Sequence, residues 1–240
     1  MTTSARLLCL DTSTPTARVA VVDGAGAPLA TAEATAERHS QHVLKLVDEV
    51  LGAAELRPDG LDALACGAGP GSFTGLRVGL AVVKGLALAT GKPLLLASSL
   101  EALALDLARA SDAPILVPCI DAGKGEVYAF ACARDAAGRV TPGGEPWRLL
   151  PAALIARLPQ LPGAVVGGNG AERHAAAFDA AGVRRVAVAG PTALSIAALA
   201  LPRLARGESD DLEKAVPAYG RPPDITTPRA KVAKVAKGDR

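Results

Sequence analysis

The sequence predicts an α/β protein made of two related lobes, each with a mixed β-sheet flanked by helices. Short apolar runs typical of strands alternate with longer segments whose apolar residues recur at helical spacing. A strand ending in aspartate, a polar turn, a returning strand and a hairpin signal occur at 6–24 and again at 115–138, about 110 residues further on. That repeat is too long for a solenoid. We therefore expect one lobe at 1–110, a second at 111–221 whose last helix can return to the first lobe, and a tail at 222–240.

The elements of the first lobe follow from hydrophobic pattern and turn signals. Asp23-Gly24 separates two apolar runs, as a hairpin turn does. Residues 37–54 carry one broad apolar stripe at spacings of three and four. The segment 74–90 ends at Gly91 with Pro93 just beyond, which is a typical helix stop. In chain order we predict strands at 6–10, 17–22 and 28–34, a helix at 37–54, a strand at 61–66, a helix at 74–90, a strand at 93–97 and a helix at 99–110.

The second lobe opens in the same way. Its first strand ends at Asp121, and a glycine-containing turn follows before the chain returns. The segment 141–163 is rich in proline and glycine and predicts a loop with a short helix. The tail from about 222 combines prolines with a Lys/Ala repeat and is predicted to be disordered. The remaining predicted elements are strands at 115–120, 126–133, 164–167 and 184–189 and a final helix at 191–206.

Charge is unevenly distributed along the chain. The formal net charge is +2, but residues 225–240 alone carry five cations against Asp239, so the rest of the chain is at −2. Aromatic residues make up only 2% of the chain, which leaves few surfaces for stacking bases. The folded part therefore gives no electrostatic reason to bind nucleic acid on its own.

The cysteines and the N-terminus indicate a protein of the cytoplasm. Four widely spaced cysteines without a CxxC pair are typical of buried free thiols rather than disulfides or a zinc site. The first residues lack the charged and apolar regions of a signal peptide. The apolar segment 76–90 contains Arg77 and Lys84, so we do not expect it to cross a membrane.

The stretch 67-GAGPGSFTG-75 is a glycine-rich loop that opens a helix. It has neither the spacing of a Walker A motif nor that of GxGxxG. Two interpretations remain open. The loop is a tight strand-to-helix turn capped by Ser72 or Thr74, or the backbone amides of 71–74 bind an anion at the helix N-terminus.

The helix after this loop has two unlike faces. Gly75 and Gly79 are four residues apart and therefore share one face. Each glycine costs a helix about 1 kcal/mol relative to alanine, which close approach of another backbone can offset. A second face carries leucine and valine. Such a helix is either sandwiched within its own chain or packed against a partner.

Several polar residues are further candidates for chemistry. Asp11 and Asp121 each end an apolar strand, where α/β nucleotide-binding folds place a magnesium-coordinating carboxylate and where a turn-forming aspartate is also common. His39 and His42 form an HxxH pair that suits a metal, but only the distant His174 is available as a third histidine. Capping and surface roles are the alternative for this pair.

Together these segments resemble one known family. The stretches LCLDTSTPTARVAVV, ERHSQHVLKLVDEVL, GAGPGSFTGLRVGLAVVKGLAL and CIDAGKGEVYAFACARD, with the late Pro217-Ala218-Tyr219-Gly220-Arg221, are similar to the TsaB family of glycoprotease-like proteins. The resemblance covers residues 6 to about 221 and departs from the family pattern at Gly220, where leucine is usual. It implies the duplicated fold of actin, Hsp70 and sugar kinases, called the ASKHA fold.

The resemblance also implies a function. TsaB is a subunit of the bacterial machinery that makes threonylcarbamoyladenosine in tRNA. We would then expect a non-catalytic dimerisation and scaffold subunit that binds and activates the paralogue TsaD, with TsaE as the ATPase partner. It would form a homodimer in isolation and meet tRNA only through the complex. ATP, ADP and metal would belong to the partner subunits, so no cofactor of its own is expected.

One comparison within the family supports this expectation. TsaD binds its catalytic metal through an HxxxH pair, and the two histidine positions fall here at Ser99 and Leu103, while Glu101 is kept. Leucine cannot ligate a metal, so we expect neither a metal nor a catalytic residue of the TsaD type. The same replacement argues against a metalloprotease.

The family pattern assigns two sets of residues. The first two helices pack against TsaD or a second TsaB, while the Asp11 turn and the glycine loop retain possible vestigial nucleotide contacts. The implied interface set is Val43, Leu44, Val47, Val50, Leu51, Gly75, Leu76, Gly79, Leu80, Val83 and Leu86, and the vestigial set is Asp11, Thr12, Ser13, Gly69, Gly71, Ser72 and Asp121.

One alternative function stays open at this point. An ATP-dependent small-molecule kinase or ATPase of the same fold would use Asp11, Thr12, Asp121 and Gly168-Asn169-Gly170 as phosphate and nucleotide contacts. For the tail at 222–240 we expect no role in folding, and a weak, salt-dependent contribution to tRNA affinity in the assembled complex.

Overall fold

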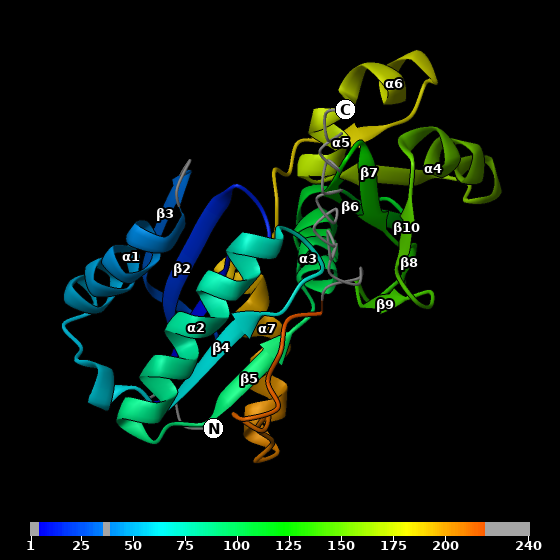
Figure 1. Ribbon diagram of the computed structural model, residues 1–240. Coiled ribbons are helices and arrows are strands. Elements are labelled where there is room, and N and C mark those ends of the chain that lie inside the picture. The colour runs from blue at the N-terminus through cyan, green and yellow to red at the C-terminus, as the bar shows by residue number, and fades with distance from the viewer. Residues whose placement is uncertain (1–4, 36–38, 219–240) are drawn as a thin grey trace, which may run out of the picture.

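A computed structural model describes residues 5–35 and 39–218, with side chains of the second range described from residue 43 onwards. Figure 1 shows two α/β lobes joined through α3 (Ser99–Ala110), which lies between them. This confirms the predicted fold class. The HxxH pair at His39 and His42 lies outside the described side chains.

The first lobe is built on a five-stranded sheet of order β3-β2-β1-β4-β5. β1, β2 and β3 form an antiparallel meander, and β4 and β5 extend the sheet in parallel with β1. The sheet is therefore mixed, as predicted. Its strands are β1 (Arg6–Asp11), β2 (Thr16–Asp23), β3 (Pro28–Thr35), β4 (Ala63–Gly67) and β5 (Leu94–Ala97), with a 3-10 helix at Pro58–Gly60 before β4.

Helices cover both faces of this sheet. α1 (His39–Ala53) and α2 (Phe73–Thr90) pack on one face, and α7 (Ala193–Ala205) packs on the other. Because side chains alternate along a strand, Leu8 and Leu10 of β1 join the core under α1 and α2. Leu7 and Cys9 join the core under α7. The last helix thus packs on the first lobe, although it follows the second lobe in sequence.

The second lobe has seven strands. β10, β7, β6, β11 and β12 run side by side, and β8 pairs with both β6 and β9. α3 packs on β6 and also on α7, so one helix contacts both lobes. The elements are β6 (Ile115–Gly123), β7 (Glu126–Ala129), β8 (Cys132–Arg134), β9 (Val140–Pro142), β10 (Trp147–Leu149), α4 (Pro151–Arg157), a 3-10 helix (Leu158–Gln160), β11 (Ala164–Gly167), α5 (Asn169–Arg173), α6 (Ala175–Ala180) and β12 (Arg185–Val186).

Three predicted elements differ from the structure. The strand expected at 126–133 breaks after Ala129, and its two parts pair with different strands. The segment 141–163 contains the expected short helix, as α4, but also the strand β10, which was not predicted. The strand expected at 184–189 is reduced to Arg185–Val186. All three lie where pairing with distant strands decides the conformation, which local pattern does not report.

The predicted partner interface needs a correction. Most of its residues lie inside the chain's own core, because the apolar stripes of α1 and α2 face the sheet. Hydrophobic periodicity identifies the buried face of a helix but does not identify what buries it. The buried members are Val43, Val47, Val50, Leu51, Gly75, Leu76, Gly79, Leu80 and Val83, whereas Leu44 is exposed and Leu86 is half-buried.

α2 has the length and composition of a membrane-spanning helix. It has 18 residues with a mean hydropathy of 1.4, and a third of it is buried within the protein. Core helices of globular proteins share these properties, so one such helix in the described part of the chain is weak evidence for a span. α2 covers β4 and contacts β1 and β5 of the first sheet.

Candidate functional site at the glycine loop

Asp11, at the end of β1, is the centre of the candidate site. It is buried, with 1% of its surface exposed. Its Oδ1 accepts hydrogen bonds from the backbone N–H of Ser13 at 2.8 Å and from Ser13 Oγ at 2.6 Å. Its Oδ2 accepts one from Ser99 Oγ at 2.6 Å. Burial raises the pKa of Asp11, and this effect outweighs the hydrogen bonds and the nearby Arg18 cation, which lower it.

The glycine loop packs directly on the Asp11–Ser13 turn. A Cβ on Gly67 would lie 1.9 Å from Asp11 Oδ2, and one on Gly71 would lie 2.4 Å from the carbonyl oxygen of Ser13. The backbone N–H of Ser72 donates to that same carbonyl at 2.7 Å. Glycine is therefore needed at position 67 because the Asp11 carboxylate lies against it, and at position 71 because the two segments of backbone touch.

The glycine face of α2 is internal as well. A Cβ on Gly75 would lie 2.1 Å from the carbonyl oxygen of Thr12, and one on Gly79 would lie 2.3 Å from Thr12 Oγ1. Thr12 Oγ1 donates to the carbonyl of Gly75 at 2.8 Å. Ser72 caps the helix by accepting from the Gly75 N–H at 3.2 Å, so Ser72 rather than Thr74 is the N-cap.

These contacts favour the structural interpretation of the loop. Ser72 N–H is bonded to Ser13, and Gly69 N–H donates to Ser99 Oγ at 3.1 Å. Thr12 and Ser13 are buried with their hydroxyls bonded inside the chain. Of the backbone amides at 71–74 that would receive a phosphate, that of Ser72 is thus bonded within the chain.

α3 begins at this site and runs on towards the second lobe. Ser99 bridges Asp11 and Gly69, and four residues later Leu103 is fully buried. A Cβ on Gly168 would lie 2.6 Å from Leu103 Cδ2 and 2.3 Å from the carbonyl of Cys119. By the family resemblance, the metal-binding histidines of TsaD fall at Ser99 and Leu103. In this chain the first position holds a hydroxyl that is hydrogen-bonded to Asp11, and the second holds a buried apolar side chain.

The second aspartate lies in a cluster of its own. The backbone N–H of Asp121 donates to Asn169 Oδ1 at 3.2 Å, and Arg173 forms an ion pair with the Asp121 carboxylate at 3.2 Å. A Cβ on Gly170 would lie 3.0 Å from the backbone N of Asp121, so this glycine allows α5 to approach β6. The structure thus brings Asp121, Asn169 and Gly170 together, while Asp11 and Thr12 lie with the glycine loop.

Among the described residues, neither the metal-ligating side chains nor the cysteine thiols form a second candidate site. No group of three or more His, Cys, Asp or Glu residues is arranged to hold a metal there. All four cysteines are buried and free, as predicted. Burial raises the pKa of their thiols, that of Cys119 to about 12, so they remain protonated at neutral pH.

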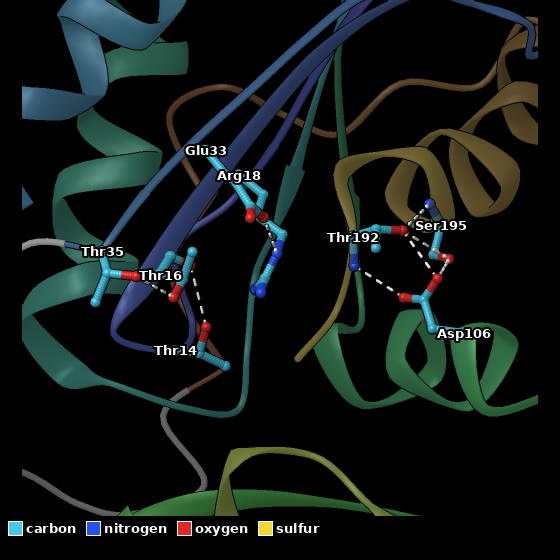
Figure 2. Close-up of polar contacts among 8 residues, drawn as sticks. All are labelled: Thr14, Thr16, Arg18, Glu33, Thr35, Asp106, Thr192 and Ser195. Atoms are coloured by element: carbon cyan, nitrogen blue, oxygen red, sulfur yellow. Dashed lines mark hydrogen bonds and ion pairs between the residues drawn. The ribbon is translucent and has the colours of Figure 1, made fainter. Parts of the chain in front are cut away.

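Sequence reasoning missed a buried network between α3 and α7. Figure 2 shows Asp106 accepting hydrogen bonds from Thr192 Oγ1 at 2.9 Å and from Ser195 Oγ at 2.7 Å. Asp106 also accepts from the backbone N–H of Thr192 at 2.8 Å and pairs with Arg109 at 2.9 Å. Nothing in the local sequence connects positions 106 and 192, so no motif could have revealed the pair.

Two surface hollows lie beside this network. One of about 390 Å³ lies between β2, β3 and the start of α7, next to the Arg18–Glu33 ion pair of 2.9 Å shown in Figure 2. The other, of about 830 Å³, lies between the β2–β3 turn and α7 and is lined mainly by small and apolar residues. Neither is lined by Asp11, the glycine loop or Asp121.

Known proteins resemble this chain in sequence and in structure. A family model described as "TsaD: tRNA N6-adenosine threonylcarbamoyltransferase" matches residues 31–140. The chain is 36% identical over 133 residues to the tRNA threonylcarbamoyladenosine biosynthesis protein TsaB of Escherichia coli (strain K12), which covers 55% of this chain and 57% of that protein. The chain spans a little over half the length of the curated relatives it matches.

The structural relatives extend the match to nearly the whole chain. The solved structure of YeaZ from Pseudomonas aeruginosa superimposes with a TM-score of 0.74 at 31% identity, covering 89% of this chain and 100% of that one. An activator of 2-hydroxyisocaproyl-CoA dehydratase from Clostridium difficile, with bound ADPNP, reaches a TM-score of 0.50 at 9% identity. At that identity the second likeness concerns the fold alone.

Fold and site together define a class. Two α/β lobes, each opening with a strand that carries an aspartate at or near its carboxyl end, give this chain an ASKHA-type fold. Its glycine loop packs against the first of these aspartates and is hydrogen-bonded to Ser13. Within that class the chain belongs to the TsaB family, which includes YeaZ.

Proposed function

We propose that this chain is a non-catalytic accessory subunit of the cytoplasmic machinery that makes threonylcarbamoyladenosine in tRNA. The single observation that carries the proposal is the closure of the glycine loop by hydrogen bonds within the chain. The Ser72 N–H donates to the Ser13 carbonyl, and the Gly69 N–H donates to Ser99 Oγ, which itself donates to Asp11. A protein that keeps the family fold but fills this site with its own backbone acts through the surfaces it presents. The name of the Escherichia coli relative supplies the pathway.

The catalytic steps would belong to partner subunits. Ser99 and Leu103 fill the positions of the TsaD metal ligands, and both are fully buried. We therefore assign the metal and the threonylcarbamoyl transfer to TsaD, and ATP hydrolysis to TsaE. The chain itself would need no cofactor.

The proposed contact surface is the outer α1–α2 face, defined here as Leu44 of α1 with Ala81, Gly85 and Leu88 of α2. Leu44 is 51% exposed and Leu88 is 74% exposed. Ala81, Gly85 and Leu88 recur at spacings of three and four, so they form one stripe. Figure 1 shows α1 and α2 on the same side of the first sheet. Exposed leucines beside small residues suit packing against other helices, those of TsaD or of a second copy.

Charged substitutions on this face test the proposal. Leu44→Asp and Leu88→Asp place a carboxylate where the free protein is already in water, so each monomer should melt as the wild type does. Each should weaken the homodimer and the TsaD complex at least tenfold, measured by light scattering and by titration. Leu150→Asp is the matched control, because Leu150 is 57% exposed in the second lobe.

Reconstitution with TsaD and TsaE provides the functional measurement. Threonylcarbamoyl transfer to tRNA should require the wild-type chain and fall with the same two variants but not with the control. Full transfer activity with both variants, or binding of MgATP by the isolated chain that Asp11→Asn abolishes, would contradict the proposal. The second result would indicate an ATP-dependent enzyme instead.

A further inference from the structure

We propose that Glu101, in the first turn of α3, is a docking residue whose carboxylate receives the ammonium group of a lysine from a partner protein. The inference rests on the proposed function, because an accessory subunit acts through its contacts with TsaD and TsaE. It adds a second contact surface to the outer α1–α2 face and states the chemistry that this second surface recognises.

Glu101 lies in a small hollow where three parts of the structure meet. α3 packs against α7, which covers the first sheet, and against β9 of the second lobe, so both lobes contribute to the hollow. Its volume is about 30 Å³. Apart from one thiol, the residues that line it beside Glu101 are apolar: Ala104, Leu105, Cys132, Val140, Pro142 and Leu199.

The carboxylate of Glu101 has no partner among the described residues. It is half-buried, and no ion pair or hydrogen bond to its side chain is formed within that part of the chain. Burial raises the pKa of Glu101, and no neighbouring cation lowers it. Asp106 of the same helix is different, because it accepts from Thr192 and Ser195 and pairs with Arg109. A half-buried charge without a counter-ion is unfavourable, so the hollow calls for a cation.

A capping role does not account for this carboxylate. Glu101 follows the N-cap Ser98 by three residues, which is the spacing of a capping box. The Ser98 hydroxyl accepts from the Glu101 N–H at 3.2 Å. The reciprocal bond, from the Ser98 N–H to the Glu101 carboxylate, is not formed among the described residues, and it would lower the pKa rather than raise it. The carboxylate therefore remains available to another group.

A lysine suits this hollow in size, charge and shape. The hollow has room for a group about as large as one water molecule, which fits a compact ammonium better than a planar guanidinium. Leu105, Val140 and Leu199 are half-buried, so they offer apolar surface to the methylene chain of a lysine. Within the described part of the chain, no group of three or more potential metal ligands includes Glu101, so a metal ion would lack further protein ligands.

The position of the hollow keeps it apart from the outer α1–α2 face. α7, which borders the hollow, covers the face of the first sheet opposite to α1 and α2. A partner bound at Glu101 would contact both lobes and leave the outer α1–α2 face accessible. The two surfaces are therefore separable by mutation.

Titration of the full-length chain with TsaD and with TsaE tests the inference. Glu101→Gln removes the charge but keeps the size of the side chain, and it should melt at or above the wild type because the lost charge was unpaired. It should weaken binding of the subunit that supplies the lysine at least tenfold, since the lysine is then left without its counter-ion. Glu172→Gln is the matched control, because Glu172 is an exposed carboxylate of α5, and it should change little.

Carbodiimide crosslinking tests the contact itself. This reagent joins a carboxylate to an amine that touches it and leaves no spacer between them. In the wild-type complex it should form an amide between the Glu101 carboxyl carbon and Nζ of a partner lysine, located by mass spectrometry, and Glu101→Gln should lose this product. A crosslink only to a lysine of the same chain, including those at 219–240 outside the described residues, would contradict the inference.

Further outcomes separate this inference from the proposed function. If Glu101→Gln binds both subunits as the wild type does, while Leu44→Asp and Leu88→Asp lose TsaD, the inference is wrong and the function stands. If Glu101→Gln loses a subunit while neither leucine variant loses TsaD, the inference is supported and the outer α1–α2 face is not the contact surface. A Glu101→Gln protein that melts well below the wild type would show that the carboxylate is bonded within the fold, which also contradicts the inference.

Discussion

Gly79 offers a direct test of how the glycine loop and α2 are held together. Its Cβ in an alanine variant would lie 2.3 Å from Thr12 Oγ1 and 3.0 Å from Leu10 Cδ1, both shorter than ordinary contacts. Moving Thr12 also weakens its hydrogen bond to the Gly75 carbonyl, now 2.8 Å. Overpacking costs about 1–3 kcal/mol and the lost hydrogen bond about 1 kcal/mol. The gain in helix propensity is about 1 kcal/mol.

We therefore expect Gly79→Ala to destabilise the monomer by about 1–3 kcal/mol, and Gly79→Leu to destabilise it further. The matched control is Gly85→Ala in the same helix, where an added Cβ meets nothing within 4 Å. It should stabilise by up to about 1 kcal/mol. At about 2–4 °C per kcal/mol for a chain of this size, thermal melting resolves the two. A Gly79→Ala protein that melts as high as Gly85→Ala would refute the internal packing of the glycine face.

Three further predictions concern buried side chains. The pKa of Asp11 is raised in the folded protein, so protonation of Asp11 stabilises the fold. This contribution to stability is fully present below the ordinary pKa of 3.8, and it is lost as the pH rises through the raised pKa of Asp11 in the folded protein. Asp11→Asn should thus melt at or above the wild type at neutral pH, and the difference should close as pH falls towards 3.8. Asp106→Ala removes the acceptor for Thr192 and Ser195 and should lower the free energy of unfolding in urea by about 2–4 kcal/mol; an unchanged midpoint would contradict the network. Val83→Asp buries a charge in the core and should abolish the cooperative melting of the monomer, so a folded Val83→Asp protein would show that α2 packs differently.

Much of the candidate site was predictable from local sequence. Asp11 at a strand end, the glycine loop and an N-cap at Ser72 or Thr74 are signals read within a few residues, and the structure shows that the N-cap is Ser72. The role of the glycine loop could not be predicted from local sequence, because a tight turn and an anion-binding site require the same glycines. The contacts of Gly67 and Gly71 with Asp11 and Ser13 favour the turn, and they join segments about 60 residues apart in sequence.

The sequence by itself determined the class of fold, since alternating strands and helices and a repeated opening motif are encoded in periodicity and turn residues. It also determined that α1 and α2 each have an apolar face. Only the tertiary structure decided that Val43 and Val83 face the first sheet, that Leu44 and Leu88 face outwards, and that Asp106 meets Thr192. The physical reason is that local pattern reports how apolar a surface is, whereas burial depends on which distant segment covers it.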